Sequence, residues 1–196
     1  CFELASSYLE NTGDLSFKKT NLPFSSQISS VNAIQVDDFN NDGFLDALLA
    51  GNLYATEVSS GRYDAGVGIS LQGNGRNDFK VIPALESGFY ADTDAKGMAK
   101  LITANDETLL LVGNNSGTIK TYAVQQKTKQ ILIEKDDVYS LLTRKGGAIS
   151  RQEFYYGSTY LSQSSRKLSL SDDVISIEII NRKGASRKIN INPTLH

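Results

Sequence analysis

The chain has 196 residues, a length that suits one large domain or two small ones. Hydrophobic residues make up 40% of it, enough for a buried core, and the formal charge of −2 gives no general attraction for nucleic acid. The longest apolar runs, such as residues 109–112, are far too short to span a bilayer. A lone Cys excludes an internal disulfide. Because the chain starts at Cys1 rather than Met, we expect it to be a piece of a longer precursor.

Short apolar runs of strand length recur along the chain, separated by clusters of Gly, Asn, Asp and Ser. The predicted strands are, in chain order, residues 32–36, 46–52, 66–72, 79–83, 99–104, 108–114, 118–124, 130–135, 153–158, 167–171, 174–181 and 186–192. Turn signals lie at residues 11–14, 73–78, 114–117 and 181–186. Because helical periodicity is hard to find anywhere, the sequence predicts an all-β chain.

The sequence also repeats itself. Residues 36–52 align with residues 90–106, with Gly43 over Gly97, and each copy leads to a strand, a glycine turn and another strand. The spacing of the two copies is in the range of one propeller blade. After about residue 140 the pattern changes, and residues 141–152 are basic and contain glycine. We therefore expect a repeat region over residues 1–145 and a small β module over residues 146–196.

The most unusual stretch is the acidic run DDFNNDGFLD, residues 37–46. Its oxygen-bearing side chains alternate, so they can converge on one centre, and Gly43 permits the sharp reversal between them. Hard oxygen ligands in a flexible loop are what Ca²⁺ prefers, and an ion would offset the repulsion between the acids. The predicted ligands are the side chains of Asp38, Asn40, Asp42 and Asp46 and the main-chain carbonyl of Phe44.

The loop differs from an EF-hand, because Leu49 occupies the position of the bidentate Glu and a strand follows directly. The pattern therefore predicts a calcium site between two strands. The alternative is that Asp42 and Gly43 form an ordinary hairpin turn with solvated acids around it. In the second copy Asp92 and Asp94 keep two ligand positions, but Lys96 and Lys100 replace the other two acids. We expect these ammonium groups to stand in for the ion there, so that the second loop binds no metal.

These motifs resemble a known family. Residues 31–52 resemble the FG-GAP/VCBS repeat, whose Asp-x-Asx-x-Asp-Gly-x-x-Asp loop carries Ca²⁺ in integrin-type β-propellers, and residues 61–79 resemble the VCBS-repeat proteins of Bacteroidetes-like bacteria. Residues 153–189, above all GSTYLSQSS, resemble the ASPIC/UnbV module that follows such repeats. The resemblance implies the C-terminal blades of a propeller, a β tail domain, and export to the cell surface.

Two departures from the family pattern stand out. The Trp-Pro-Asp-Gly-like turn of the tail module is NRKG here, at residues 181–184. In addition, a closed propeller needs roughly twice the residues available. The chain is therefore expected to be a truncated piece of a propeller, or its blades open into another arrangement.

Few residues are suited to catalysis. The only His is His196 and the only Cys is at the opposite end, so no nucleophile–base pair is predicted. Acid pairs at residues 136–137 and 172–173 are interpreted as solvated turns, although a glycosidase with two carboxylates stays open. A stacking surface for a sugar or a protein is a further candidate, built from Tyr155, Tyr156 and Tyr160. Alternation in a strand predicts that one of the first two is buried.

The sequence therefore predicts a non-enzymatic, calcium-stabilised extracellular module for binding or adhesion. Its partner would be a protein or a glycan at the cell surface, with no nucleic acid and no membrane-spanning segment involved. The basic residues of the tail are interpreted as a solvated face rather than an RNA-binding surface. The alternative function is a carbohydrate-active enzyme, or an accessory domain of one. The oligomeric state stays open.

Overall fold

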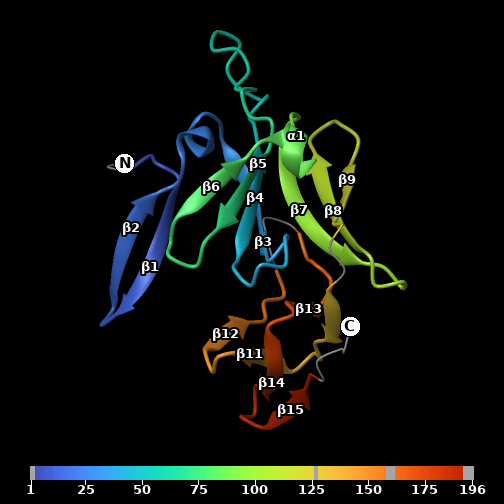
Figure 1. The fold of residues 1–196 in the computed structure, drawn as a ribbon. Coiled ribbons are helices and arrows are strands. Elements are labelled where there is room, and N and C mark those ends of the chain that lie inside the picture. The colour runs from blue at the N-terminus through green and yellow to red at the C-terminus, as the bar shows by residue number, and fades with distance from the viewer. Residues whose placement is uncertain (1–2, 126–127, 158–161, 192–196) are drawn as a thin grey trace.

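The structure is a computed structural model that describes residues 3–125, 128–157 and 162–191. The prediction of an all-β chain is confirmed: the described residues form antiparallel sheets, none of which closes on itself, with one short helix and one 3-10 turn. No helix among these residues is both long enough and apolar enough to cross a membrane. Figure 1 shows two groups of strands, one above the other, that correspond to the N-terminal and C-terminal parts of the chain.

The N-terminal part contains a hairpin and two larger sheets. The hairpin pairs β1 (Ser7–Gly13) with β2 (Ser16–Asn21), and the 3-10 turn Phe24–Gln27 follows. The first sheet has the order β3 (Val31–Asp37), β4 (Asp46–Gly51), β5 (Ile69–Gly73) and β6 (Phe79–Ile82). After α1 (Ala84–Ser87), the second sheet has the order β7 (Ala95–Ile102), β8 (Thr108–Asn114) and β9 (Lys120–Ala123).

These two sheets pack against each other around one hydrophobic core. Alternate residues of the strands point to it, because successive side chains of a strand face opposite sides of the sheet. The buried members are Ala33, Leu48, Ala50, Phe89, Ala91, Ala95, Met98, Leu110 and Val112. The contact between β3 and β7 positions the end of β3, and with it the acidic run, beside the second sheet.

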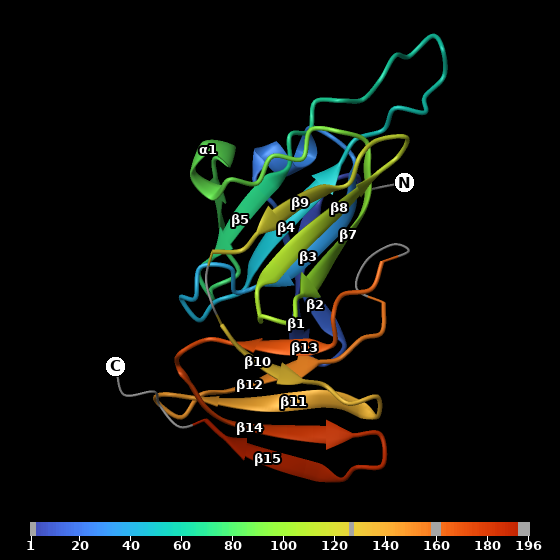
Figure 2. The same cartoon turned by 90° about the vertical axis from the view of Figure 1, so that its right-hand side faces the viewer.

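The C-terminal part has its own core. A four-stranded sheet has the order β12 (Ile149–Glu153), β11 (Asp137–Arg144), β14 (Val174–Asn181) and β15 (Ser186–Asn190), and a separate ladder pairs β10 (Lys129–Leu132) with β13 (Lys167–Leu170). Figure 2 shows these strands stacked below the N-terminal sheets. The buried core residues are Ile133, Leu142, Leu168, Leu170, Val174, Ile177 and Ile179.

The two parts meet at a polar junction along β7. The Lys100 N–H donates to Ser164 Oγ at 2.9 Å, and the Ser165 N–H donates to the Lys100 carbonyl at 2.7 Å. The Lys100 ammonium forms an ion pair with the Asp37 carboxylate and donates to Ser169 Oγ at 3.1 Å. Lys100 therefore connects β3, β7 and β13, and the junction is held by hydrogen bonds and charge.

The predicted strands are mostly present, but two hairpins were missed. The β1–β2 hairpin was not predicted because every residue of β2 is exposed, so the strand carries no alternation of buried and exposed positions. The β11–β12 hairpin lies in the basic, glycine-bearing segment, where Gly146 and Gly147 form the turn with φ of +95° and +86°. The strand predicted over residues 153–158 is wrong for residues 154–157, because β12 ends at Glu153.

The structure also qualifies the predicted repeat and the predicted boundary. In the first copy the acidic loop joins β3 to β4, whereas in the second copy β7 already begins at Ala95 and α1 precedes it, so the two copies are not equivalent hairpins. The expected boundary near residue 145 falls in the turn between β11 and β12, which pair in one sheet. The change from one set of sheets to the other lies between β9 and β10, and the division into two domains stays a prediction.

Candidate metal centre

The acidic run forms the connection between β3 and β4, as expected for a loop between two strands. Asp37 pairs with Asp46 across the two strands, and residues 38–46, which run from the end of β3 to the first residue of β4, are called the cation loop below. Asn41 and Gly43 have positive φ, +61° and +89°, which reverses the chain twice within a few residues. Asn and Gly are the residues that adopt this region at least cost.

The side chains of the cation loop turn inward and accept hydrogen bonds from its own backbone. The Asp38 carboxylate accepts the N–H groups of Asp42 at 3.1 Å and Gly43 at 2.8 Å. Asn40 Oδ1 accepts the Asp42 N–H at 2.9 Å, and the Asp42 carboxylate accepts the Phe44 N–H at 2.9 Å. These bonds form successive local turns in which the side chain of one residue accepts an N–H group two to five residues later. Asp38 and Asn40 are half-buried, whereas Asp42 is exposed.

Asp46 closes the loop from the start of β4 and is only 4% exposed. Its two oxygens accept the N–H groups of Phe39 at 3.1 Å and Gly73 at 3.0 Å. Burial raises the pKa of the Asp46 carboxyl, and the nearby carboxylates of Asp42 and Asp38 raise it further. Burial likewise raises the pKa of Asp38, with a contribution from Asp42. The three acids are therefore close enough to repel one another.

Within residues 3–125, 128–157 and 162–191, no cationic side chain forms an ion pair with these three acids. The donor set consists of oxygens alone and includes three carboxylates, which fits the preference of a hard divalent cation. Asn40 Nδ2 and Gln72 Nε2 donate to Asp42 at 2.9 and 3.3 Å, so these amides would have to release Asp42 for an ion. Within the described part of the chain, no group of three or more His, Cys, Asp and Glu side chains is arranged to hold a metal by itself.

The second copy shows the opposite arrangement. Lys96 forms an ion pair with Asp94 at 2.5 Å, and Asp92 forms one with Lys120 of β9. Burial raises the pKa of Asp94, but Lys96 and Asn115 outweigh it and hold that pKa below its ordinary value. Lys96 therefore compensates this copy as expected, whereas the expectation for Lys100 is wrong. Lys100 contacts Asp37 because it lies on the face of β7 that carries Met98, two residues earlier, towards β3.

Two of the three tyrosines proposed as a stacking surface lie in the described part of the chain, and both are exposed. Tyr155 and Tyr156 are 73% and 49% exposed, so the prediction that one of them is buried is wrong. The strand ends before them, and its alternation no longer applies. The Tyr156 hydroxyl donates to the Lys135 carbonyl, and its ring lies 4.2 Å from the guanidinium of Arg166, which leaves it a structural role. Tyr160 lies outside the described residues.

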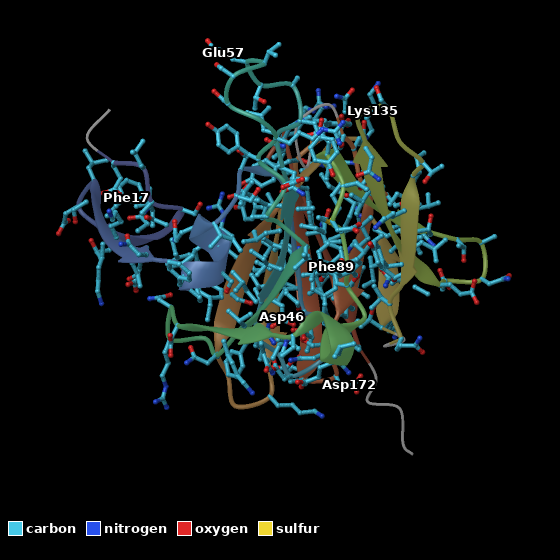
Figure 3. The ribbon with its side chains drawn as sticks, turned by 90° about the horizontal axis from the view of Figure 1, so that it is seen from above. Phe17, Asp46, Glu57, Phe89, Lys135 and Asp172 are labelled. Atoms are coloured by element: carbon cyan, nitrogen blue, oxygen red, sulfur yellow. The ribbon has the colours of Figure 1, made fainter. Side chains whose placement is uncertain are left out.

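Sequence reasoning missed the contacts of the cation loop with three residues of the C-terminal part, Arg144, Asp172 and Asp173. Asn41 Nδ2 donates to Asp172 Oδ2 at 3.0 Å, and Arg144 forms an ion pair with Asp173 at 2.7 Å beside Gly43. Figure 3 labels Asp46 and Asp172, which lie on the same side of the molecule. The pair at residues 172–173 has no local signal for this role, since two acids before a strand are also typical of a solvated turn.

Comparisons with known proteins leave the family open: no protein-family model matches the chain, and no curated protein matches it significantly.

Proposed function

We propose that the chain is a calcium-stabilised, non-enzymatic binding or adhesion module that is exported to the cell surface. The observation that carries the proposal is the cation loop, where three mutually repelling carboxylates, one of them 4% exposed, have no cationic partner among the described residues. A buried charge of this kind is costly unless it is paired or coordinates a metal. The second copy, where lysines pair with the acids, shows the alternative solution within the same chain.

The cation loop would hold the ion through the side chains of Asp38, Asn40, Asp42 and Asp46, the Phe44 carbonyl and water. Ca²⁺ accepts six to eight oxygen ligands in flexible geometry, whereas Mg²⁺ demands a tight octahedron that a surface loop does not enforce. The bound ion would supply positive charge and cross-link β3 to β4. The role of the ion is therefore structural, and it would fix the N-terminal part for contact with a partner.

The resemblance to VCBS-type propellers and the packing of two successive sheets around one core support the proposal of propeller-like blades. A protein or a glycan is the proposed partner. Two exposed features are available for contact: Tyr155, and the projecting segment between β4 and β5, which carries the fully exposed Val58 and stands out at the top of Figure 1. A glycan array combined with a hydrolase screen tests this part, since binding without turnover is expected.

Calcium is expected to stabilise the folded chain, because the folded state binds the ion and the unfolded chain hardly does. Extracellular modules bind at roughly 0.1–1 mM, and calcium at 100 times the dissociation constant adds about 2.7 kcal/mol to the free energy of unfolding. Thermal melting in EDTA and in about 10 mM calcium measures this gain in stability. The gain is smaller when the affinity of the loop for calcium is lower.

The Asp42→Ala variant should lose the calcium-dependent rise in melting temperature while its metal-free form stays folded. Asp136→Ala is the matched control, because Asp136 is an exposed acid of the C-terminal part that pairs with Arg182, and this variant should keep the full response. If the wild-type protein melts at the same temperature in EDTA and in calcium, the metal proposal is wrong and the run at residues 37–46 is only a turn.

A further inference from the structure

The cation loop contacts the C-terminal part at the turn of residues 171–173, between β13 and β14, and at Arg144 at the end of β11. Asn41 Nδ2 donates to Asp172 Oδ2 at 3.0 Å across this contact. Asn41 is not one of the proposed ligands, but it lies between Asn40 and Asp42, which are. Its positive φ of +61° places it at one of the two reversals of the loop. A bond at this residue therefore restrains the backbone that orients the ligands on either side.

Gly43, at the second reversal of the loop, lies against the ion pair between Arg144 at the end of β11 and Asp173 of this turn. Arg144 Nη1 donates to both oxygens of Asp173, at 2.8 and 2.7 Å, and to Ser171 Oγ at 3.2 Å. A Cβ atom on Gly43 would lie 3.4 Å from both Arg144 Nη1 and Asp173 Oδ2. The loop backbone therefore lies directly against this pair, and the positive φ of Gly43, +89°, favours glycine at this position.

The turn itself is fixed to the C-terminal sheet. The Lys145 N–H donates to the Asp173 carbonyl at 2.7 Å, and the Val174 N–H donates to the Ser171 carbonyl at 3.1 Å. Asp37, the residue before the cation loop, is held by Lys100, which also donates to Ser169 of β13. The C-terminal part therefore restrains the loop directly at its two reversals, and at its start only through Lys100 of β7.

We propose that Asn41, Asp172 and Arg144 are positioning residues of the cation loop, so that calcium binding and docking of the C-terminal part strengthen each other. This inference rests on the function proposed above. Coupling of two binding events is reciprocal: whatever the docked C-terminal part adds to calcium affinity, bound calcium adds to docking. Asp172 also contributes negative charge beside the site, since it forms no ion pair within the described residues.

Calcium titration calorimetry on the full chain tests the coupling. Asn41→Gly removes the amide donor but tolerates the positive φ, and Asp172→Asn removes the charge but keeps an acceptor oxygen. Each substitution is expected to weaken calcium affinity about fivefold, at the low end of couplings between linked sites. The double variant should lose less than the product of the two, because Asn41→Gly removes the same bond that Asp172→Asn weakens by exchanging a charged acceptor for a neutral one. Asp136→Asn, which removes an equivalent charge elsewhere in the C-terminal part, should bind like the wild type.

Hydrogen exchange, measured with each variant at the same multiple of its own dissociation constant for calcium, gives a second measurement that a change in affinity alone does not move. Calcium should slow exchange of the amides at residues 171–174 in the wild type, and the slowing should be lost in Asn41→Gly. If the wild type binds no calcium, both the proposed function and this inference fail. If the wild type binds calcium but both variants bind equally well and keep the protection, the calcium module stands and the coupling is overturned. Equal weakening by Asp172→Asn and Asp136→Asn would also overturn it, because general electrostatics would then suffice.

Discussion

Replacing Lys100 by Met is expected to lower the free energy of unfolding by about 3–5 kcal/mol, the usual cost of leaving one partner of a buried ion pair without the other. The side chains of Lys100 and Asp37 are only 9% and 15% exposed, so water cannot compensate the remaining carboxylate. The same change removes the hydrogen bond from Lys100 to Ser169 in β13. The substitution therefore acts on the N-terminal core and on the junction together.

Urea unfolding at neutral pH measures this loss, with Lys167→Met as the matched control. Lys167 forms an ion pair with Asp106 at 2.7 Å, but the Asp106 side chain is 65% exposed, so its loss should cost no more than about 1 kcal/mol. Adding Asp37→Leu to Lys100→Met should recover part of the loss, because the unpaired charge is then gone. Equal losses in the two single variants would show that the Lys100 pair is no more important than a surface contact.

Arg187→Ala is expected to destabilise the C-terminal part by about 3 kcal/mol, near the lower end of the range for broken buried pairs because Arg187 is partly exposed. Arg187 donates to both oxygens of Asp137, at 2.8 and 2.6 Å, and the Asp137 side chain is 2% exposed. The same carboxylate accepts the Glu134 N–H at 2.7 Å and so fixes the start of β11. Removing Arg187 leaves this buried carboxylate without its cation.

Two further variants make this prediction specific, again by urea unfolding. Arg187→Lys should recover only part of the loss, because an ammonium cannot match both carboxylate oxygens at once. Arg182→Ala removes a pair whose side chains are 56% and 55% exposed and should change stability by less than about 1 kcal/mol. If Arg187→Ala lowers the free energy of unfolding no more than Arg182→Ala does, the two hydrogen bonds from Arg187 to Asp137 contribute little to the stability of the fold.

How much of the fold could be predicted depended on whether a strand has one buried face. The bounds of β14, residues 174–181, were predicted because Ile177 and Ile179 alternate with exposed or half-buried neighbours. β2 lacks such a face and was missed, and its pairing with β1 is not encoded by hydrophobicity. Tyr155 and Tyr156 were misplaced because the end of β12 is set by the departure of the chain from the sheet, which local sequence does not specify.

The candidate site shows the same division between local and tertiary information. The spacing of Asp38, Asn40 and Asp42 predicted side chains that converge on one centre; the structure shows that all three accept hydrogen bonds from N–H groups of their own loop. The ion itself and its ligands stay a prediction. The partner of Lys100 and the contact of Asn41 with Asp172 join residues far apart in the sequence, so neither could be inferred without the packing of the two parts.

The position of β11 between β12 and β14 determines how the chain tolerates being cut. A fragment that starts at residue 146 loses β11, to which β14 is paired along its whole length, and it loses Ile133 and Leu142 from the core that contains Ile177 and Ile179. Unpaired, apolar edges of this kind recruit other chains, so such a fragment should aggregate. Cleavage between β9 and β10 instead leaves every C-terminal strand beside its partner. Dissection of the protein is therefore best made ahead of Lys129.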